Sequence, residues 1–156
     1  MNELDLSNEL KMLGELLVSQ YREVLAREGI NATDQLSNTA GVEVSKGTTF
    51  WELSLLLEDY WKYVEYGRRA GKRPPIDAIE KWIEAKPVIP TPDANGHVPS
   101  THSLAYLIAR KIGLEGTTPR HALREAQQGQ WAAAVGDMAA RILENEEAYL
   151  VKEFKA

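Results

Sequence analysis

The densest cluster of charged and aromatic side chains lies in one short run, YVEYGRRAGKRPP at 63–75. Four cations fall within six positions of it: Arg68, Arg69, Lys72 and Arg73. Guanidinium and ammonium groups bind carboxylates and phosphates. At surface dielectric the four charges repel one another by roughly a few tenths of a kcal/mol each. An acidic partner surface would relieve that repulsion, whereas the simpler interpretation is a solvated turn.

The aromatic residues around the basic run allow two interpretations. Most rings are expected in the core, and Trp51 and Trp82 fall on apolar faces of their segments. Trp61 and Tyr66 break the local pattern, and rings of this kind are enriched at interfaces. Base stacking against Trp61 and Tyr66 stays open as an alternative. We predict that Tyr63, Glu65 and Tyr66 hold the base of the basic loop.

Patterns for catalysis or metal binding are weak. His97 and His102 are five residues apart with Asp93 as the nearby carboxylate, which is less than a zinc site needs, so exposed loop histidines are favoured. Glu58 and Asp59 are adjacent on an expected strand, so they would point to opposite faces and make a poor acid–base pair. The chain has no cysteine, nucleophile elbow or phosphate-binding glycine loop. We expect no enzymatic activity and no cofactor or metal.

Length and charge limit the domain organisation and the classes of function that remain. The 156 residues fit a single domain over 1–156, with a core over 4–125 and a C-terminal helical extension over 130–156. The net charge of −5 argues against wrapping DNA with the whole surface, so any nucleic-acid contact would be local. Neither a signal peptide nor a membrane span is expected, which favours folding in the cytosol.

Hydrophobic periodicity predicts an α+β fold: a long N-terminal helix, a β-hairpin or small antiparallel sheet, and then several helices. Residues 4–28 form the first helix, with Ser7 as N-cap and Gly29 as terminator. A polar loop follows over 30–40. Alternating apolar residues on both sides of Lys46-Gly47 then predict the hairpin.

The later helices are marked by prolines, glycines and apolar spacing. A short helical turn is expected within 59–66, and a helix begins after the double proline and ends before Pro87. The proline-rich segment 87–100 reads as an irregular loop. Thr101 or Ser103 is expected to cap the next helix, which ends at Gly116. A short helix to about 125 precedes a last helix from about 130 into the 140s, with Leu143 on its apolar face.

Four motifs follow one another in this order: Y-x-x-Y-V-E-Y-G-R-R-x-G-K-x-P-P at 60–75, I-x-x-I-x-x-W-I at 76–83, L-A-Y-L-I-A-R-K-I at 104–112 and E-G-T-T-P-R at 115–120. Their order and spacing over 40–121 resemble the tail-completion or neck proteins of tailed bacteriophages. The chain departs from that pattern in His121-Ala122-Leu123, where the family has an aromatic, in a longer proline-rich loop and in an extended last helix. The resemblance implies an α+β subunit of a ring between portal and tail, without catalysis.

The leading hypothesis is therefore a structural virion protein that forms an oligomeric ring at the head–tail junction. Its expected partners are copies of itself, other neck, portal or tail proteins, and passing DNA without sequence preference, but no membrane. It would lie in the virion, and in the host cytoplasm during assembly. Subunit or channel contacts are predicted at Arg68, Arg69, Lys72, Arg73, Tyr63, Glu65 and Tyr66.

A head-to-tail contact between subunits would place the basic loop of one copy on the acidic face of the next. The acidic candidates are Glu115, Glu125 and the cluster that starts at Glu144. The alternative function is a nucleic-acid-binding module that uses the basic loop, 67–73, with Trp61 and Tyr66.

Overall fold

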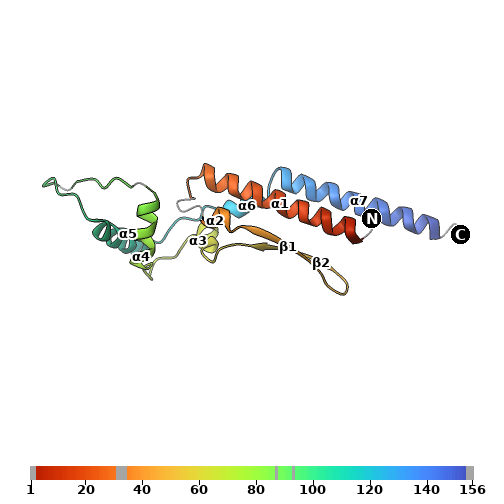
Figure 1. Ribbon diagram of the computed structural model, residues 1–156, viewed down its shortest axis with the longest axis horizontal. Helices are drawn as coiled ribbons and strands as arrows, with labels where there is room; N and C mark the ends of the chain where they lie inside the picture. The colour runs from red at the N-terminus through yellow and green to blue at the C-terminus, as the bar shows by residue number, and fades with distance from the viewer. Residues whose placement is uncertain (1–2, 31–34, 87, 93, 154–156) are drawn as a thin grey trace.

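The computed structural model describes residues 3–30, 35–86, 88–92 and 94–153, and it has an elongated shape (Figure 1). The elements in chain order are α1 (Glu3–Arg27), α2 (Gln35–Asn38), β1 (Gly41–Lys46), β2 (Trp51–Leu56), α3 (Trp61–Tyr66), α4 (Ile76–Ala85), α5 (Thr101–Glu115), α6 (Ala122–Ala126) and α7 (Gln130–Glu153). This arrangement confirms the predicted α+β layout.

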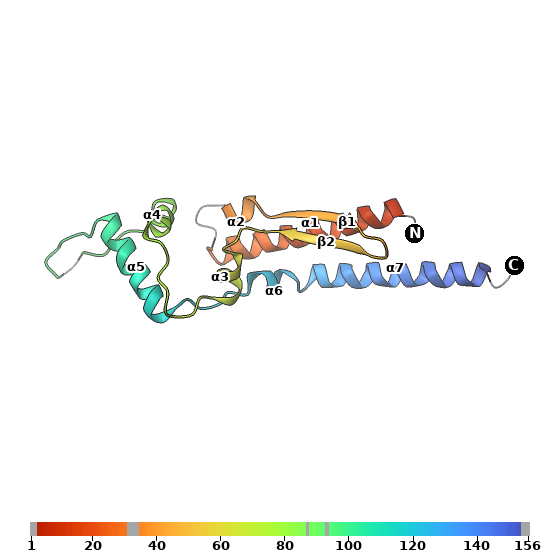
Figure 2. The same cartoon turned by 90° about the horizontal axis from the view of Figure 1, so that it is seen from below.

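Two parts lie at opposite ends of the long axis (Figures 1 and 2). The first part, which we call the body, consists of α1, the hairpin, α3, α6 and α7. The second part, which we call the module, consists of α4, α5 and the loop between them. The segments that join the body to the module run through a narrow region, which we call the waist.

The hairpin lies against α1. Strands β1 and β2 pair antiparallel, with Val42 opposite Leu55 and Val44 opposite Leu53. Alternate side chains of a strand point to one face, so these four residues form the apolar face of the hairpin. Gly14 of α1 is buried, and a Cβ at this position would collide with Val42. The missing side chain at Gly14 therefore lets the helix and the hairpin approach closely.

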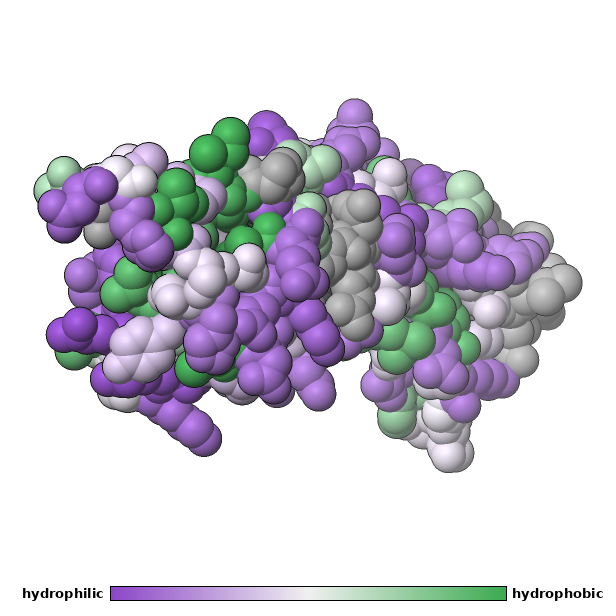
Figure 3. All heavy atoms as spheres, turned by 60° about the vertical axis from the view of Figure 1, so that its left-hand side comes forward, coloured by the Kyte–Doolittle hydropathy of each residue, from purple (hydrophilic) through white to green (hydrophobic). Residues whose placement is uncertain are grey.

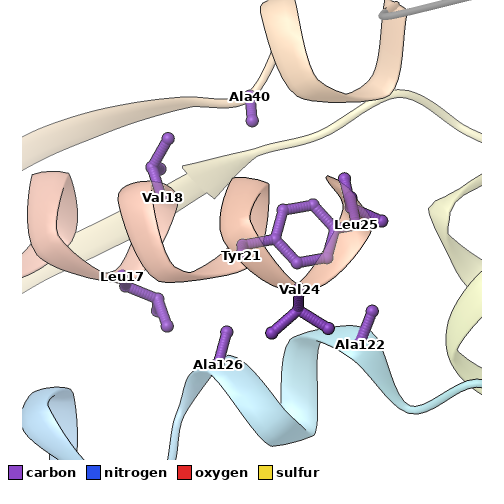
Figure 4. Close-up of a cluster of buried hydrophobic side chains, with 8 residues drawn as sticks. All are labelled: Leu17, Val18, Tyr21, Val24, Leu25, Ala40, Ala122 and Ala126. Carbon is purple, nitrogen blue, oxygen red and sulfur yellow. The ribbon is translucent and has the colours of Figure 1, made fainter. Parts of the chain in front are cut away.

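The buried core lies between α1, the hairpin and α6 (Figure 4). Tyr21 and Leu25 of α1 are its most deeply buried large side chains. Its members are Leu17, Val18, Tyr21, Val24, Leu25, Ala40, Ala122 and Ala126. The alanines of α6 allow that short helix to lie close to α1. None of the members comes from α4 or α5, so the core belongs to the body.

Helix α7 packs antiparallel along the N-terminal half of α1 (Figure 2). The indole N–H of Trp131 donates to the carbonyl of Leu13 at 3.1 Å, and Arg141 pairs with Glu9 at 2.7 Å. The prediction that Leu143 lies on the packed face is wrong, because this side chain is 64 % exposed. Residue 143 lies about 100° around the helix from the half-buried residue 142, which places it at the solvent side of the packed face.

Three further local predictions need correction. Helix α1 begins at Glu3, so Ser7 lies within it, and acidic residues in a first turn favour such an early start. The N-cap of α5 is Ser100, whose hydroxyl accepts from the N–H of Ser103, and not Thr101 or Ser103. One turn of helix, α2, falls within the segment predicted as a loop at 30–40. Residues 31–34 of that loop, and Pro87, lie outside the described residues.

The last helix, predicted to run into the 140s, extends to Glu153, whereas the boundaries predicted at Gly29, Pro75 and Gly116 are confirmed. Gly29 follows α1 with φ of 61°, and the N–H of Ile30 donates to the carbonyl of Leu25 at 3.0 Å. This pattern of a left-handed glycine with a return hydrogen bond ends many helices. Helix α4 starts directly after Pro75, and α5 ends at Gly116.

Candidate interaction site at the waist

The waist joins two segments that are far apart in the sequence. The N–H of Arg68 donates to the carbonyl of Thr117 at 3.1 Å, and the N–H of Thr117 donates to the carbonyl of Arg68 at 2.8 Å. The Y-V-E-Y-G-R-R motif and the G-T-T-P-R motif therefore run side by side. The module and most of the basic loop that leads into it lie between these two paired residues.

Two glycines make this close pairing sterically feasible. Gly67 and Gly116 have φ of 69° and 76°, values that side chains with a Cβ rarely adopt. A Cβ on Gly67 would collide with the carbonyl oxygen of Thr117, and one on Gly116 would collide with that of Arg68. Each glycine thus opens the space that the opposite strand of the waist occupies.

Glu65 is the buried acid of the site, with only 5 % of its surface exposed. Its carboxylate accepts hydrogen bonds from the N–H groups of Leu123 at 2.8 Å and Arg124 at 3.3 Å. These groups lie in the first turn of α6, where unpaired N–H groups and the positive helix end favour an anion. The residue at the N-cap position itself, His121, supplies no side-chain cap. Glu65 therefore caps α6 from across the waist.

The basic loop lies against the C-terminal end of α5. The N–H of Gly71 donates to the carbonyl of Gly113 at 2.8 Å. The guanidinium of Arg73 lies 5.7 Å from the ring centre of Tyr106 on the same helix. A helix C-terminus carries partial negative charge. The chain itself therefore offsets part of the repulsion that the sequence led us to assign to an acidic partner.

The four cations differ in their surroundings. Arg68 is half-buried, and its guanidinium lies 5.0 Å from the ring centre of Tyr63, a cation–π distance. Arg69 and Lys72 are exposed, and no ion pair holds either of them among the described residues. Arg69 and Lys72 are thus the cations of the loop that stand ready for an outside partner.

The aromatic residues predicted around the basic loop also differ in their surroundings and exposure. One face of Tyr63 is covered by Arg68. Trp61 is half-buried and packs on the core of the body, with its ring centre 6.1 Å from that of Tyr66. Tyr66 is 63 % exposed. Tyr66 is therefore the ring beside the basic loop that is most accessible to a partner.

The acids proposed as counterparts of the basic loop fall into two groups, those that already form ion pairs and those that do not. Glu125 pairs with Arg27, and Glu115 pairs with Lys111 at 3.9 Å. Glu144, Glu146 and Glu147 on α7 are exposed, and no ion pair in the described part of the chain includes them. The acids that remain available thus lie on α7, at the far end of the molecule from the module.

A groove of about 620 Å³ lies at the waist between the body and the module. Tyr63 and Trp82 contribute rings to its lining. The ammonium of Lys86 spans the groove and donates to the carbonyl of Gly29 at 2.6 Å. Sequence reasoning did not identify Lys86, because nothing local marks a lysine whose acceptor lies 57 residues away.

The formal charge is unevenly distributed along the chain. Residues 67–121, which make the waist and the module, carry nine Lys or Arg and five Asp or Glu, a net charge of +4. Residues 1–66 have a net charge of −7, and residues 122–156 have a net charge of −2. The molecule is therefore basic at one end and acidic at the other.

The histidines do not form a metal site in the described part of the chain. His102 Nδ1 lies 2.7 Å from a carboxylate oxygen of Glu80. No cluster of three His, Asp or Glu side chains able to share one ion is found in 3–30, 35–86, 88–92 and 94–153.

No protein-family model, curated protein or solved structure matches this chain. Of the helices described, none has both the length and the apolar character needed to cross a bilayer.

Proposed function

We propose that this chain is a structural virion protein of a tailed phage, one subunit of an oligomeric ring at the head–tail junction. The ring joins the portal to the tail and leaves a channel for DNA. One observation carries the proposal: two of the four motifs behind the resemblance, with 48 residues between Arg68 and Thr117, meet as hydrogen-bonded neighbours at the waist. Glu65, in the first of these motifs, also accepts hydrogen bonds from the first turn of α6, which directly follows the second.

The charge distribution supports assembly of identical copies. A basic end and an acidic end on one chain favour head-to-tail contacts, which form a ring when the rotation between copies closes. Arg69 and Lys72 are the cations that face a neighbouring subunit or the channel. The proposed function involves no catalysis, and its mechanism is the association of subunits.

Mass spectrometry provides the direct test. Native mass spectra of the purified protein are expected to contain a closed oligomer of one size, and peptides of the chain are expected in purified phage particles. A protein that stays monomeric at high concentration and is missing from particles would refute the proposal.

A charge-reversal experiment examines the basic loop. The double variant Arg69→Glu/Lys72→Glu is expected to weaken the ring relative to the wild type, most strongly at low salt, because the reversed charges repel the acidic surface of the neighbouring subunit and salt screens this repulsion. The control is Lys62→Glu/Lys81→Glu, which changes the net charge equally at exposed lysines outside the loop. Equal dissociation of both variants would show that the loop has no specific contact.

A second candidate function is a nucleic-acid-binding module. The observation in its favour is that Arg69, Lys72 and Tyr66 are all exposed and close in sequence, which suits phosphate contact beside a stacking ring. Fluorescence anisotropy with labelled DNA would then give binding that weakens steeply with salt and is lost in Arg69→Ala/Lys72→Ala. No binding at low salt would exclude this candidate.

A further inference from the structure

Helix α5 carries apolar side chains on two opposite faces. One face buries Ala105, Ala109 and Gly113 against α4 and the basic loop. The opposite face presents Leu107 and Leu114, which are 51 % and 65 % exposed. A helix that is apolar on both sides needs a partner on each. Within the described residues, α4 is the element that packs extensively on α5, so one face is left without a partner.

This second face has a defined shape and charge. Leu107 and Leu114 are two turns apart, about 10 Å along the axis. Arg110 and Lys111 lie between them on the same side and are exposed. We call these four residues the α5 ridge. Figure 3, turned so that this end comes forward, shows hydrophobic patches at the surface among hydrophilic side chains.

The other end of the molecule has a groove of complementary character. A cavity of about 420 Å³ lies between α1 and α7 and is lined mainly by Met12, Leu13, Leu16 and Met138. Met12 is 68 % exposed. Methionine side chains adapt their shape to a partner. We call this cavity the α1–α7 groove.

The charges at the rim of the groove are predominantly acidic. Arg141 is paired with Glu9, a contact that raises the pKa of Arg141. Asp137 lines the groove one turn from Arg141 and helps to raise the pKa of Arg141, but no direct ion pair with Asp137 is found among the residues that the structure covers. Farther along α7 lie the exposed acids of the cluster that begins at Glu144. A ligand with apolar and cationic side chains side by side would match this rim.

We infer that the α5 ridge of one copy docks in the α1–α7 groove of the next copy. Within one copy, ridge and groove lie at opposite ends of the long axis, so no copy fills its own groove (Figures 1 and 2). Leu107 and Leu114 would enter the groove, and Arg110 would face Asp137. The contact uses different surfaces on its two sides, so it propagates from copy to copy. The inference rests on the proposed assembly function and names its surfaces.

Two variants that each retain one of the surfaces test the inference. The ridge variant, Leu107→Asp/Leu114→Asp, keeps an intact groove. The groove variant, Met12→Lys/Asp137→Lys, keeps an intact ridge. All four positions are exposed, so both variants are expected to fold, which circular dichroism checks. Each variant alone should self-associate at least about tenfold more weakly than the wild type, as expected when buried leucines are lost from a contact.

The mixture of the two variants gives the decisive result. The intact ridge of the groove variant can dock in the intact groove of the ridge variant, and no further copy can add to either side. Native mass spectrometry of the mixture should therefore show one-to-one heterodimers, identified by the masses of the two variants, and nothing larger. Ile89→Asp and Leu143→Asp, at exposed apolar positions outside both surfaces, are the controls and should assemble like the wild type.

Four outcomes would overturn the inference. If the wild type assembles and the mixture yields no heterodimer, or if either variant assembles like the wild type, the surfaces are wrong while the ring proposal stands. If the ridge variant alone forms homodimers, the contact joins like surfaces. If the wild type stays monomeric up to about millimolar concentration and is missing from particles, the inference and the proposed function fail together.

Discussion

Glu65 is buried and caps α6, a role that its place in the motif does not indicate. Its carboxylate holds the first turn of α6 by two N–H donors, and α6 in turn supplies Ala122 and Ala126 to the core. The prediction from the sequence that Glu65 holds the base of the basic loop stays a prediction. Its partners lie 58 and 59 residues ahead, so no local pattern could identify it as a helix cap.

We predict that Glu65→Gln lowers the free energy of unfolding by about 1–2 kcal/mol, because the amide loses the charge and one acceptor that cap α6. Urea denaturation followed by circular dichroism measures the change. Glu43→Gln, at an exposed position of the hairpin, serves as the control and should stay within about 0.5 kcal/mol of the wild type. A Glu65→Gln protein as stable as this control would disprove the capping role.

Tyr21 gives a pH-dependent prediction. Burial, with smaller contributions from Tyr60 and Glu65, raises the pKa of Tyr21 well above its usual value. Above about pH 10 the unfolded chain loses this phenol proton while the folded chain keeps it. The contribution of Tyr21 to stability is therefore complete below pH 10. It then falls by up to about 1.4 kcal/mol per pH unit as the pH rises further.

The measurement compares wild type and Tyr21→Phe by urea unfolding between pH 8 and pH 11, a range set around the usual tyrosine pKa of about 10. The variant should lose less stability than the wild type as the pH rises, because phenylalanine does not ionise. Tyr66→Phe, which changes an exposed ring, should follow the wild-type pH profile. Parallel profiles for wild type and Tyr21→Phe would contradict the assigned burial effect.

Among the elements, the two paired segments of the waist depend most on single residues. Gly116 ends α5, where its N–H donates to the carbonyl of Ile112 at 2.8 Å, and it also makes room for Arg68. Gly129 has a similar φ of 66°, but a Cβ there would meet no atom within 4 Å. The two positions thus separate the cost of the backbone conformation from the cost of a collision.

Gly129→Ala should destabilise the protein by about 1 kcal/mol, the cost of a left-handed conformation. Gly116→Ala should cost at least about twice as much, because the waist must also open to accommodate the new Cβ. Thermal unfolding measures both variants. Hydrogen exchange of the Arg68 and Thr117 amides should accelerate in Gly116→Ala alone. Similar losses in both variants would mean that the waist tolerates the extra atom.

How well each element could be predicted from the sequence depended on its length and periodicity. The alternation of apolar residues was sufficient to predict β1 and β2. Apolar residues spaced three and four apart were sufficient to predict α1. Helix α2 is a single turn and has no periodicity to detect. The cap of α5 was misplaced because Ser100, Thr101 and Ser103 all carry hydroxyls, and only the backbone conformation at Ser100 distinguishes them.

At the scale of the whole molecule, the module is held to the body by few contacts. The core of the body has no member in α4 or α5, and the connections across the waist are chiefly backbone hydrogen bonds and the Lys86 contact. The single domain predicted over 1–156 stays a prediction. A sequence pattern indicates which residues are buried, but it does not indicate whether they are buried in the core of the body or in the module.

Hydrogen exchange should separate the two parts of the monomer. Amides of α5 near Ala105 and Ala109 should exchange with a smaller opening free energy than those of α1 near Tyr21 and Leu25, because fewer buried apolar contacts hold the module. Exchange monitored by NMR over minutes to days gives both values in one sample. Equal protection of α1 and α5 would indicate that the body and the module open as one cooperative unit.

The pairing at the waist also makes the chain a modular scaffold. Arg68 and Thr117 face each other as in an antiparallel ladder, and the 48 residues between them leave and return at one place. A tight turn of about two residues, as in a β-hairpin, can join such a pair. The shortened protein would show whether the body folds without the module. The same junction offers a point at which an unrelated folded domain can be inserted.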